Sequence, residues 1–121
     1  MRKIFIALIL GSLLLVAACA PKEVGRSYYP SGKLKSEAVI VNGLLQGPST
    51  MFYENGKKMG EANYEGGVLN GKSISYYENG KMKGEAAYKF GVLDGETKSW
   101  NENGELTGTA KFENGLDISN R

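Results

Sequence analysis

The sequence lacks the side chains on which most active sites and metal centres depend. None of its 121 residues is histidine, so the commonest general base and metal ligand is absent. The serines therefore have no histidine to activate them, and neighbours such as Lys72 and Ser73 would point to opposite faces of a strand. No Asp-x-Asp or EF-hand spacing occurs, which argues against a calcium loop. We expect neither a cofactor nor a metal.

Cysteine and long apolar runs are almost absent as well. Cys19 is the only cysteine, so no intramolecular disulfide can form. The one long apolar run, residues 4–18, has fifteen residues, whereas a transmembrane helix needs about 20. It follows the basic pair Arg2-Lys3 and ends in small residues before Cys19, which is the layout of a secretory signal peptide. The sequence predicts that residues 1–18 are a signal peptide that is removed.

The end of this segment, Val16-Ala17-Ala18-Cys19, resembles the lipobox of bacterial lipoproteins. The resemblance implies cleavage between Ala18 and Cys19, and acyl chains on the sulfur and the new amino group of Cys19. Two or three acyl chains, at about 0.8 kcal/mol per buried methylene, would anchor the chain in a membrane of the cell envelope. Residue 20 is Ala rather than Asp, which by the same resemblance implies the outer membrane in a Gram-negative cell. The alternative is an ordinary signal peptide that happens to contain a cysteine.

An excess of charge of one sign is also missing from the mature chain. The whole sequence has 15 Lys and Arg against 13 Asp and Glu, and loss of residues 1–18 removes Arg2 and Lys3. That leaves 13 basic and 13 acidic side chains, a net charge near zero. Such a chain has no positive field to attract nucleic acid or anionic lipid headgroups, so we expect no nucleic-acid partner.

What the sequence does contain is a repeat of 24 residues, which is clearest when residues 52–71 are compared with residues 76–95. Rows of this length begin at Tyr29, Tyr53, Tyr77 and Asn101. Glycine recurs in each row, at Gly32, Gly56, Gly80 and Gly104 and again at Gly43, Gly67, Gly91 and Gly115. The repetition predicts a repeat domain over residues 28–121, with units at 29–52, 53–76, 77–100 and 101–121. Residues 19–27 are then a lipidated N-terminus and a short linker.

Each row divides into two half-units of Gly-x-x-x-Gly followed by an aromatic, and each half-unit is interpreted as one strand. Pairs such as Asn55-Gly56 and Asn42-Gly43 favour type I′ hairpin turns, in which both residues have positive φ. Apolar and polar residues alternate in Met82–Tyr88, which predicts one packed and one wet face. A neighbouring aromatic is expected to lie over the second glycine of each half-unit. The fold class is therefore all-β, an elongated antiparallel meander of about seven hairpin strands.

At this point the sequence resembles a known family, the bacterial variant of the MORN repeat. Its pattern, Y-x-N-G-K-x-x-G-E-x-x-Y-x-x-G-x-x-x-G, matches residues 53–71 and 77–95 almost position by position. Residues 29–47 and 101–115 match more loosely, with Pro30-Ser31 in place of Glu-Asn and Asn101 in place of the leading Tyr. The resemblance implies an elongated sheet of β-hairpins. It also implies that such proteins are often labelled as antitoxin components of toxin–antitoxin systems.

One column of carboxylates, Glu37, Glu61 and Glu85, recurs once per repeat. Paired carboxylates can perform acid–base chemistry on sugars. The column lies on the face that also carries lysines, so the simpler interpretation is a solvated charge ladder, with Lys35, Lys57 or Lys83 as cross-strand partners.

Aromatic side chains are the candidate contact residues. Adjacent aromatics in a strand face opposite sides, so one member of pairs such as Tyr76-Tyr77 is expected to be exposed. A column of exposed aromatics on a rigid sheet is a typical contact surface. The candidates for contact with a partner are Tyr29, Tyr53, Tyr77 and Trp100.

These observations predict a non-enzymatic, lipid-anchored envelope protein that presents a repeat sheet to a protein partner. Repeat sheets gain binding area by extension rather than by forming a reaction pocket. The alternatives are an antitoxin or immunity protein that neutralises a partner toxin, a phospholipid or membrane-surface binding module, and an enzyme that uses the glutamate column.

Overall fold

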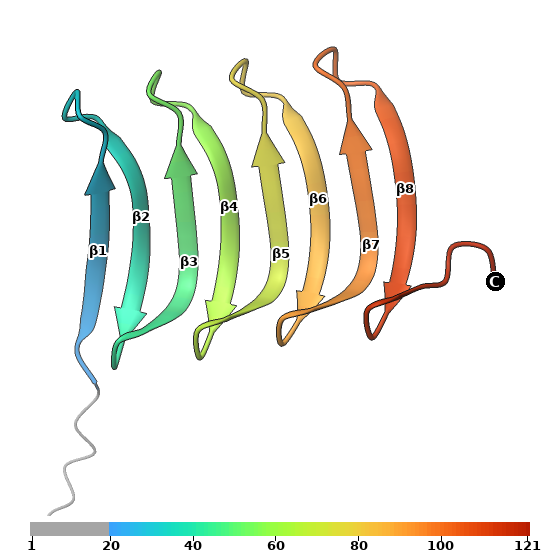
Figure 1. The fold of residues 1–121 in the computed structure, drawn as a ribbon, viewed down its shortest axis with the longest axis horizontal. Coiled ribbons are helices and arrows are strands. Elements are labelled where there is room, and N and C mark those ends of the chain that lie inside the picture. Colours follow the sequence, from blue (N-terminus) through green and yellow to red (C-terminus); the bar gives the residue numbers. More distant parts are fainter. Residues whose placement is uncertain (1–19) are drawn as a thin grey trace, which may run out of the picture.

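The computed structural model describes residues 20–121, which form a single antiparallel sheet of nine strands in sequence order (Figure 1). The strands are β1 (Lys22–Tyr28), β2 (Leu34–Val41), β3 (Leu44–Phe52), β4 (Lys58–Glu65), β5 (Val68–Tyr76), β6 (Met82–Lys89), β7 (Val92–Trp100), β8 (Leu106–Glu113) and β9 (Leu116–Asp117). No helix occurs in the part of the chain that the structure describes. The all-β meander predicted from the repeat is confirmed.

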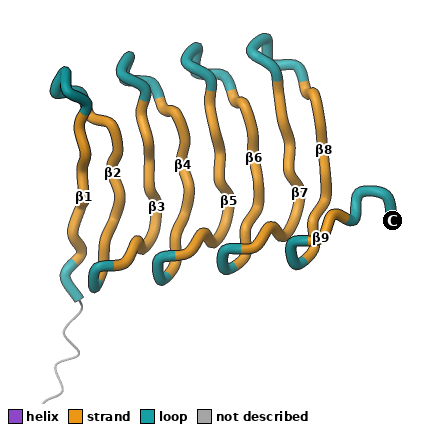
Figure 2. The backbone as a smooth tube through the Cα atoms, in the orientation of Figure 1, coloured by secondary structure: helices purple, strands orange, loops and turns teal. Residues whose placement is uncertain are grey.

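The sheet is one layer thick, and each strand packs almost entirely against its sequence neighbours (Figure 2). Among residues 20–121 no hydrophobic side chain is fully buried, and most are half-buried. The prediction of one packed and one wet face is therefore wrong, because no second layer covers either face. Stability must come from contacts between neighbouring repeats, as in other solenoid-like arrays.

The turns at the upper edge in Figure 1 are three-residue turns, not the predicted type I′ turns. In the second of them the Tyr53 N–H donates to the Lys57 carbonyl (2.8 Å) and the Gly56 N–H donates to the Tyr53 carbonyl (2.9 Å). Only Gly56 has positive φ (85°), so Asn55 keeps an ordinary conformation. This is the three-residue hairpin that ends in a left-handed glycine. The Asn55 Oδ1 instead accepts the Lys57 N–H at 2.9 Å.

The turns at the lower edge in Figure 1 have two residues, and here the type I′ prediction holds. Val41 pairs with Leu44, so only Asn42 (φ 52°) and Gly43 (φ 77°) lie between β2 and β3. The third lower turn places Phe90 at φ 47°, a region that bulky residues seldom occupy.

The sheet has two more strands than predicted, one at each end. The segment expected to be a linker, residues 19–27, contains most of β1, which pairs with β2 through contacts such as Arg26 with Glu37. β1 stands 24 residues before β3 but has Glu23 where β3 has Gly47, so the glycine pattern fails to reveal it. At the other end, Leu116–Asp117 begins a further strand that stops after two residues.

The second glycines of the half-units, such as Gly60 and Gly95, have different surroundings from those predicted. A Cβ on Gly60 would meet the Ile74 carbonyl oxygen at 3.3 Å and the Met51 Cε at 3.6 Å, so backbone and methionine approach it rather than an aromatic ring. Gly95, with φ 122°, pairs with Phe112, but its nearest side-chain atom is the Cβ of Ala87, at 2.9 Å from a Cβ built there. Close approach is confirmed at Gly60 and Gly95, where the approaching group differs from the one predicted, but nothing lies within 4 Å of a Cβ built on Gly47.

Candidate functional site

One face of the sheet gathers the glutamate column and the aromatic residues that end three strands. Glu61 lies opposite Thr50 on one side and Ile74 on the other, and Ile74 lies opposite Glu85. Directly paired residues of an antiparallel sheet project to the same side, as do residues two apart on one strand. We call this side the glutamate face, defined by Glu37, Glu61, Glu85, Phe52, Tyr76 and Trp100.

Each carboxylate on the glutamate face forms an ion pair, although not with the lysines that the sequence suggested. Glu37 binds the Arg26 Nε at 2.7 Å, Glu61 binds the Lys58 Nζ at 3.0 Å, and Glu85 binds the Lys72 Nζ at 3.0 Å. The predicted partners Lys35, Lys57 and Lys83 are wrong, because the strand register brings other cations closer. Such exposed pairs contribute little to stability, about 0–1 kcal/mol each, so they mainly set the charge pattern of the face.

Glu61 has a second partner, the Tyr76 hydroxyl, which donates to its Oε1 at 2.6 Å. This hydrogen bond, together with Lys58, lowers the pKa of Glu61. The same hydrogen bond and partial burial raise the pKa of Tyr76 to about 12. A general acid needs a carboxyl pKa that is raised toward neutrality, so the shift at Glu61 runs against acid catalysis.

The backbone spacing of the glutamates is wider than the carboxyl separations of glycosidases. Glutamates two strands apart are separated by about 10 Å at the backbone. Retaining glycosidases hold their two carboxyl groups about 5–5.5 Å apart, and inverting ones about 6.5–9.5 Å. Glu61 and Glu85 are in addition paired with Lys58 and Lys72 on an open surface, rather than with each other.

Replacing Tyr76 with phenylalanine tests this hydrogen bond, and we expect a loss of about 1 kcal/mol in unfolding free energy at pH 7. The folded-state pKa of Glu61 lies below its usual value of 4.5, so its stabilisation is present above that pH and is lost as the pH falls through the folded value. The difference between wild type and Tyr76→Phe in urea unfolding should therefore shrink from pH 7 to pH 3. Tyr64→Phe, which removes a half-buried hydroxyl from β4, is the matched control. An equal difference at both pH values would contradict the assignment.

Three of the four candidate contact residues are placed between repeats at the upper edge. The hydroxyls of Tyr29, Tyr53 and Tyr77 donate to the carbonyls of Phe52, Tyr76 and Trp100, at 2.7, 2.7 and 2.8 Å. Each tyrosine thus ties its own turn to the end of the strand that leads into the next upper turn. The Nζ of Lys35 and Lys83 lie 5.7 and 5.6 Å from the ring centroids of Tyr29 and Tyr77. Contact of these tyrosines with a partner stays a prediction, whereas their hydrogen bonds between the turns and the strand ends are seen in the structure.

The fourth candidate, Trp100, is half-buried at the end of β7 on the glutamate face. Its carbonyl accepts the Tyr77 hydroxyl, and its pairing partner on β8 is Leu106. Trp100 therefore belongs with Phe52 and Tyr76, which occupy the same position in earlier repeats.

A second ladder joins successive upper turns, and sequence reasoning missed it. The Asn55 Nδ2 donates to the Glu78 carbonyl at 3.2 Å and the Lys57 Nζ donates to the Asn79 carbonyl at 3.4 Å. The equivalent Asn79 and Lys81 bond to the fourth repeat in the same way. The recurrence of Asn and Lys at fixed positions is the available signal, but sequence reasoning assigns the asparagines to turn geometry and Lys57 to the glutamate column.

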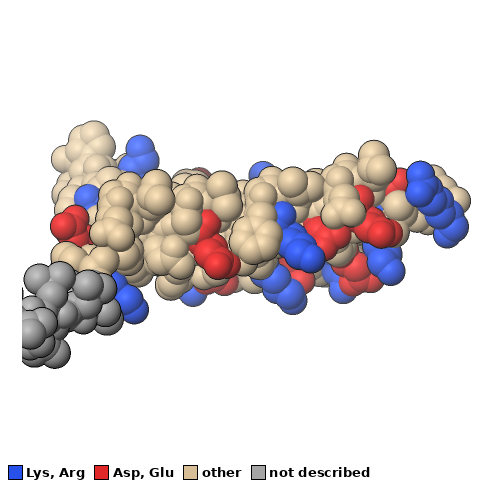
Figure 3. Space-filling view, turned by 90° about the horizontal axis from the view of Figure 1, so that it is seen from below, with Lys and Arg blue, Asp and Glu red and all other residues tan. Residues whose placement is uncertain are grey.

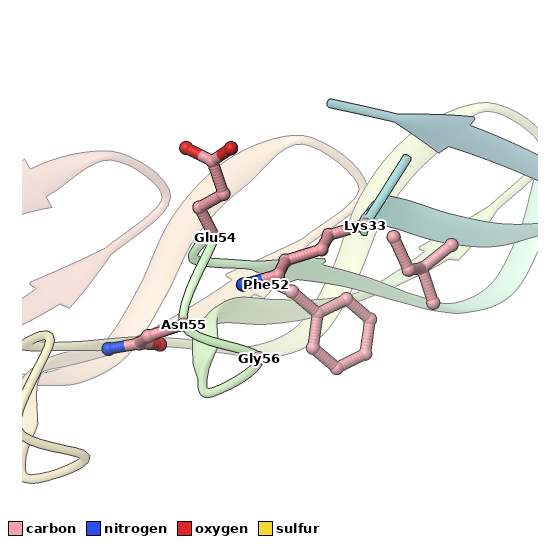
Figure 4. Close-up of a pocket in the computed structure, with 6 residues that line it drawn as sticks. Lys33, Phe52, Glu54, Asn55 and Gly56 are labelled. Atoms are coloured by element: carbon pink, nitrogen blue, oxygen red, sulfur yellow. The ribbon is translucent and has the colours of Figure 1, made fainter. Parts of the chain in front are cut away.

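The hollows along the upper edge are shallow and open. The one shown in Figure 4 has a volume of about 330 Å³ and is lined by Lys33, Leu34, Phe52, Glu54, Asn55 and Gly56. In that view the Glu54 carboxylate points away from the Phe52 ring. No group of three or more metal-ligating side chains occurs among residues 20–121. The hollow is a groove between repeats rather than a reaction chamber.

Viewed from below, the molecule is narrow and elongated, with acidic and basic side chains interspersed among uncharged ones (Figure 3). The first residue after each lower turn is apolar and exposed: Leu44, Val68, Val92 and Leu116. The lower edge therefore presents a row of apolar side chains without a field of one sign.

The predicted signal peptide, its cleavage point at Ala18 and the lipidated Cys19 lie outside the described residues 20–121. Within those residues no helix is both long and apolar enough to cross a membrane.

Comparison with known proteins identifies the repeat. No curated protein matches the chain. Among solved structures, a chain in the crystal structure of accessory secretory proteins 1, 2 and 3 of Streptococcus pneumoniae is similar, with 14% identity and a TM-score of 0.43; the similarity covers 74% of this chain and 17% of that chain. The family model described as the MORN repeat variant matches four times, at residues 24–42, 45–65, 69–90 and 93–114. The chain belongs to the MORN repeat variant family.

Proposed function

We propose that the protein is a non-enzymatic, lipid-anchored envelope protein whose repeat sheet binds a protein partner through the glutamate face. The observation that carries this proposal is the single-layer sheet, in which side chains of the same kind recur on one open face at intervals of two strands. MORN repeats are generally non-catalytic modules that bind proteins or membranes. The ion-paired carboxylates and the lowered pKa of Glu61 favour contact over catalysis.

Charge supports a protein partner over a lipid surface. Each carboxylate of the glutamate face is paired with a cation, so the face has no positive field to attract anionic headgroups. A partner with a matching row of basic side chains would meet Glu37, Glu61 and Glu85 at regular spacing. Such complementarity contributes to specificity and to the association rate.

The position of β1 determines which edge of the sheet an anchor at Cys19 would hold near the membrane. β1 begins at Lys22 at the lower edge, three residues after Cys19 (Figure 1). Three extended residues span at most about 11 Å, so acyl chains on Cys19 would hold the lower edge close to the membrane. The two sheet faces would stay accessible to a partner.

Replacing Cys19 with alanine tests the anchor. With the full precursor expressed in a bacterial host, we expect the wild type in the membrane fraction, with an acylated Cys19 at the mature N-terminus by mass spectrometry. The variant should lose that modification and leave the membrane fraction, or remain as uncleaved precursor. A soluble wild-type protein without acyl chains would contradict the anchor and favour the antitoxin-like alternative.

Charge reversal on the sheet tests partner binding. The probe is the protein encoded by the adjacent gene, added to purified full-length protein in detergent. We expect the triple change of Glu37, Glu61 and Glu85 to Lys to weaken binding by at least about tenfold. The control reverses Glu54, Glu78 and Glu102, which lie in the upper turns. If the partner is a toxin that the protein inhibits, the immunity role is supported; pelleting of anchor-free protein with liposomes in place of protein binding would contradict the proposal.

A further inference from the structure

The two free edges of the sheet differ in how well they are protected against pairing with another chain. β1 carries Lys22, Glu23 and Arg26, and charged side chains on an edge strand discourage pairing with another chain. The upper part of β8, Leu106–Ala110, has no charged residue and no proline. Only β8 therefore offers an unprotected stretch of strand edge among residues 20–121.

The lower part of the β8 edge is closed by the C-terminal segment. Asp117 pairs with Phe112, the Ile118 N–H donates to the Lys111 carbonyl (2.8 Å), and the Lys111 N–H donates to the Ser119 Oγ (2.9 Å). The Asp117 Oδ1 in turn accepts hydrogen bonds from the Ser119 N–H and hydroxyl at 2.9 and 2.6 Å. The backbone of Lys111 is thus satisfied from outside the sheet.

Above Lys111 this cover ends. Backbone groups of an antiparallel strand alternate in direction, so the N–H and C=O of Thr109 point outward as those of Lys111 do. No segment among the described residues pairs with them. An outward donor and acceptor on an uncharged strand form the usual docking point for an added strand.

The side chains at this edge also lack a cover that earlier repeats possess. Leu34 lies opposite Tyr28 and shares the hollow of Figure 4 with Phe52 of the next strand, and it is half-buried. Leu106 has the same place in the fourth repeat and lies opposite Trp100, but no strand follows it on the other side. It is 56% exposed.

The strands that fill this place within the sheet share a pattern at their upper ends. The last four residues of each of these strands are, in order, Ser or Thr, any residue, Met or Ser, and an aromatic. The pattern occupies residues 49–52, 73–76 and 97–100. We propose that the open edge of β8 binds an extended segment of a partner protein with this pattern, antiparallel to β8, with its aromatic side chain over Leu106. This inference rests on the proposed protein-binding function and names a second contact, continuous with the interface between the repeats.

A second copy of the chain fits this edge poorly, although Gly25–Tyr28 approaches the pattern. If β1 of the second copy paired with β8 in the register of the internal repeats, its lower part would overlap the place that Ile118 and Ser119 occupy. β1 also has Glu23 where the internal strands have glycines of positive φ, such as Gly95. A short segment that covers only Leu106–Ala110 avoids both conflicts.

Fluorescence anisotropy with a labelled peptide tests the proposal. The probe has the sequence of residues 72–76, Lys-Ser-Ile-Ser-Tyr, and the protein is the full chain in detergent. We expect saturable binding, weakened at least about tenfold when the peptide tyrosine is replaced by alanine or when Leu106→Ser is introduced. Thr109→Pro, which removes the outward N–H but no bond to β7, should abolish binding. Leu44→Ser, an equally exposed leucine at the lower edge, is the matched control and should bind as the wild type does.

Three results would overturn the proposal: no saturable binding, equal binding by Leu106→Ser, or a concentration-dependent dimer that Thr109→Pro dissolves. Circular dichroism establishes that each variant keeps its strands. Failure of the peptide while the partner still binds the glutamate face would reject only the β8 contact. If the partner binds neither the glutamate face nor the β8 edge, the proposed function itself is rejected.

Discussion

Replacing Gly95 with alanine should destabilise the sheet by roughly 3 kcal/mol or more, through two separate effects. Gly95 has φ 122°, a conformation that side chains rarely adopt. A Cβ at this position would also lie 2.9 Å from the Cβ of Ala87, which belongs to β6 and has no flexible end that could move aside. The backbone strain and the steric overlap therefore add at one residue. Urea unfolding followed by circular dichroism measures the loss.

Gly47 separates the two effects. It has the same place in the first repeat and φ 97°, but nothing lies within 4 Å of a Cβ built on it. Gly47→Ala should therefore show the strain alone, about 1–3 kcal/mol. Equal losses for the two variants would mean that the contact with Ala87 is relieved by a small shift of β6. A smaller loss for Gly95→Ala would contradict the argument.

The hairpins were predictable because their signals are local. Glycine and asparagine at fixed spacing specify turns within a few residues, and the 24-residue recurrence repeats each signal several times. The same reasoning assigned type I′ geometry to Asn55-Gly56, since the dipeptide alone does not distinguish a two-residue turn from a three-residue one. The distinction is set by the pairing of Phe52 with Lys58 beyond the turn.

The ends of the sheet were harder to predict, since terminal strands depart from the repeat. β1 has Glu23 where β3 has Gly47, and at the other end Asn101 stands where the earlier repeats have a tyrosine. The Asn101 Oδ1 instead accepts the N–H groups of Asn103 and Glu105 within its own turn, both at 3.0 Å. A search for identity between repeats passes over departures of this kind.

The contacts of the candidate site were not predictable from the column pattern. Recurrence reveals a column of glutamates and a column of aromatics, but the hydrogen bond between Glu61 and Tyr76 depends on the register, which places Ile74 opposite Glu61 and Tyr76 diagonal to it. The tyrosines of the upper edge were assigned to partner contact because adjacent aromatics must face opposite sides. The structure adds an internal partner for each hydroxyl, 23 residues away in sequence.

Removing the three hydroxyls of this ladder together, with Tyr29, Tyr53 and Tyr77 changed to Phe, should lower the unfolding free energy by about 3 kcal/mol. Each hydrogen bond is part-buried and its loss leaves one strand-end carbonyl without that donor, at about 1 kcal/mol apiece. The three sites lie two strands apart, about 10 Å, so the losses should add. Urea unfolding of the single and triple variants measures both the size and the additivity.

The matched control changes Tyr28, Tyr64 and Tyr88 to Phe, which removes the same number of hydroxyls from strands rather than from turns. A similar loss of unfolding free energy in the control would show that the three hydroxyls of the ladder stabilise the sheet no more than other tyrosine hydroxyls do. Because Phe keeps the aromatic ring, the triple variant also separates the two roles of these residues. If binding to the partner is unchanged while stability falls, the three hydroxyls serve the fold and not the contact; if binding falls in the folded variant, the hydroxyls also take part in recognition.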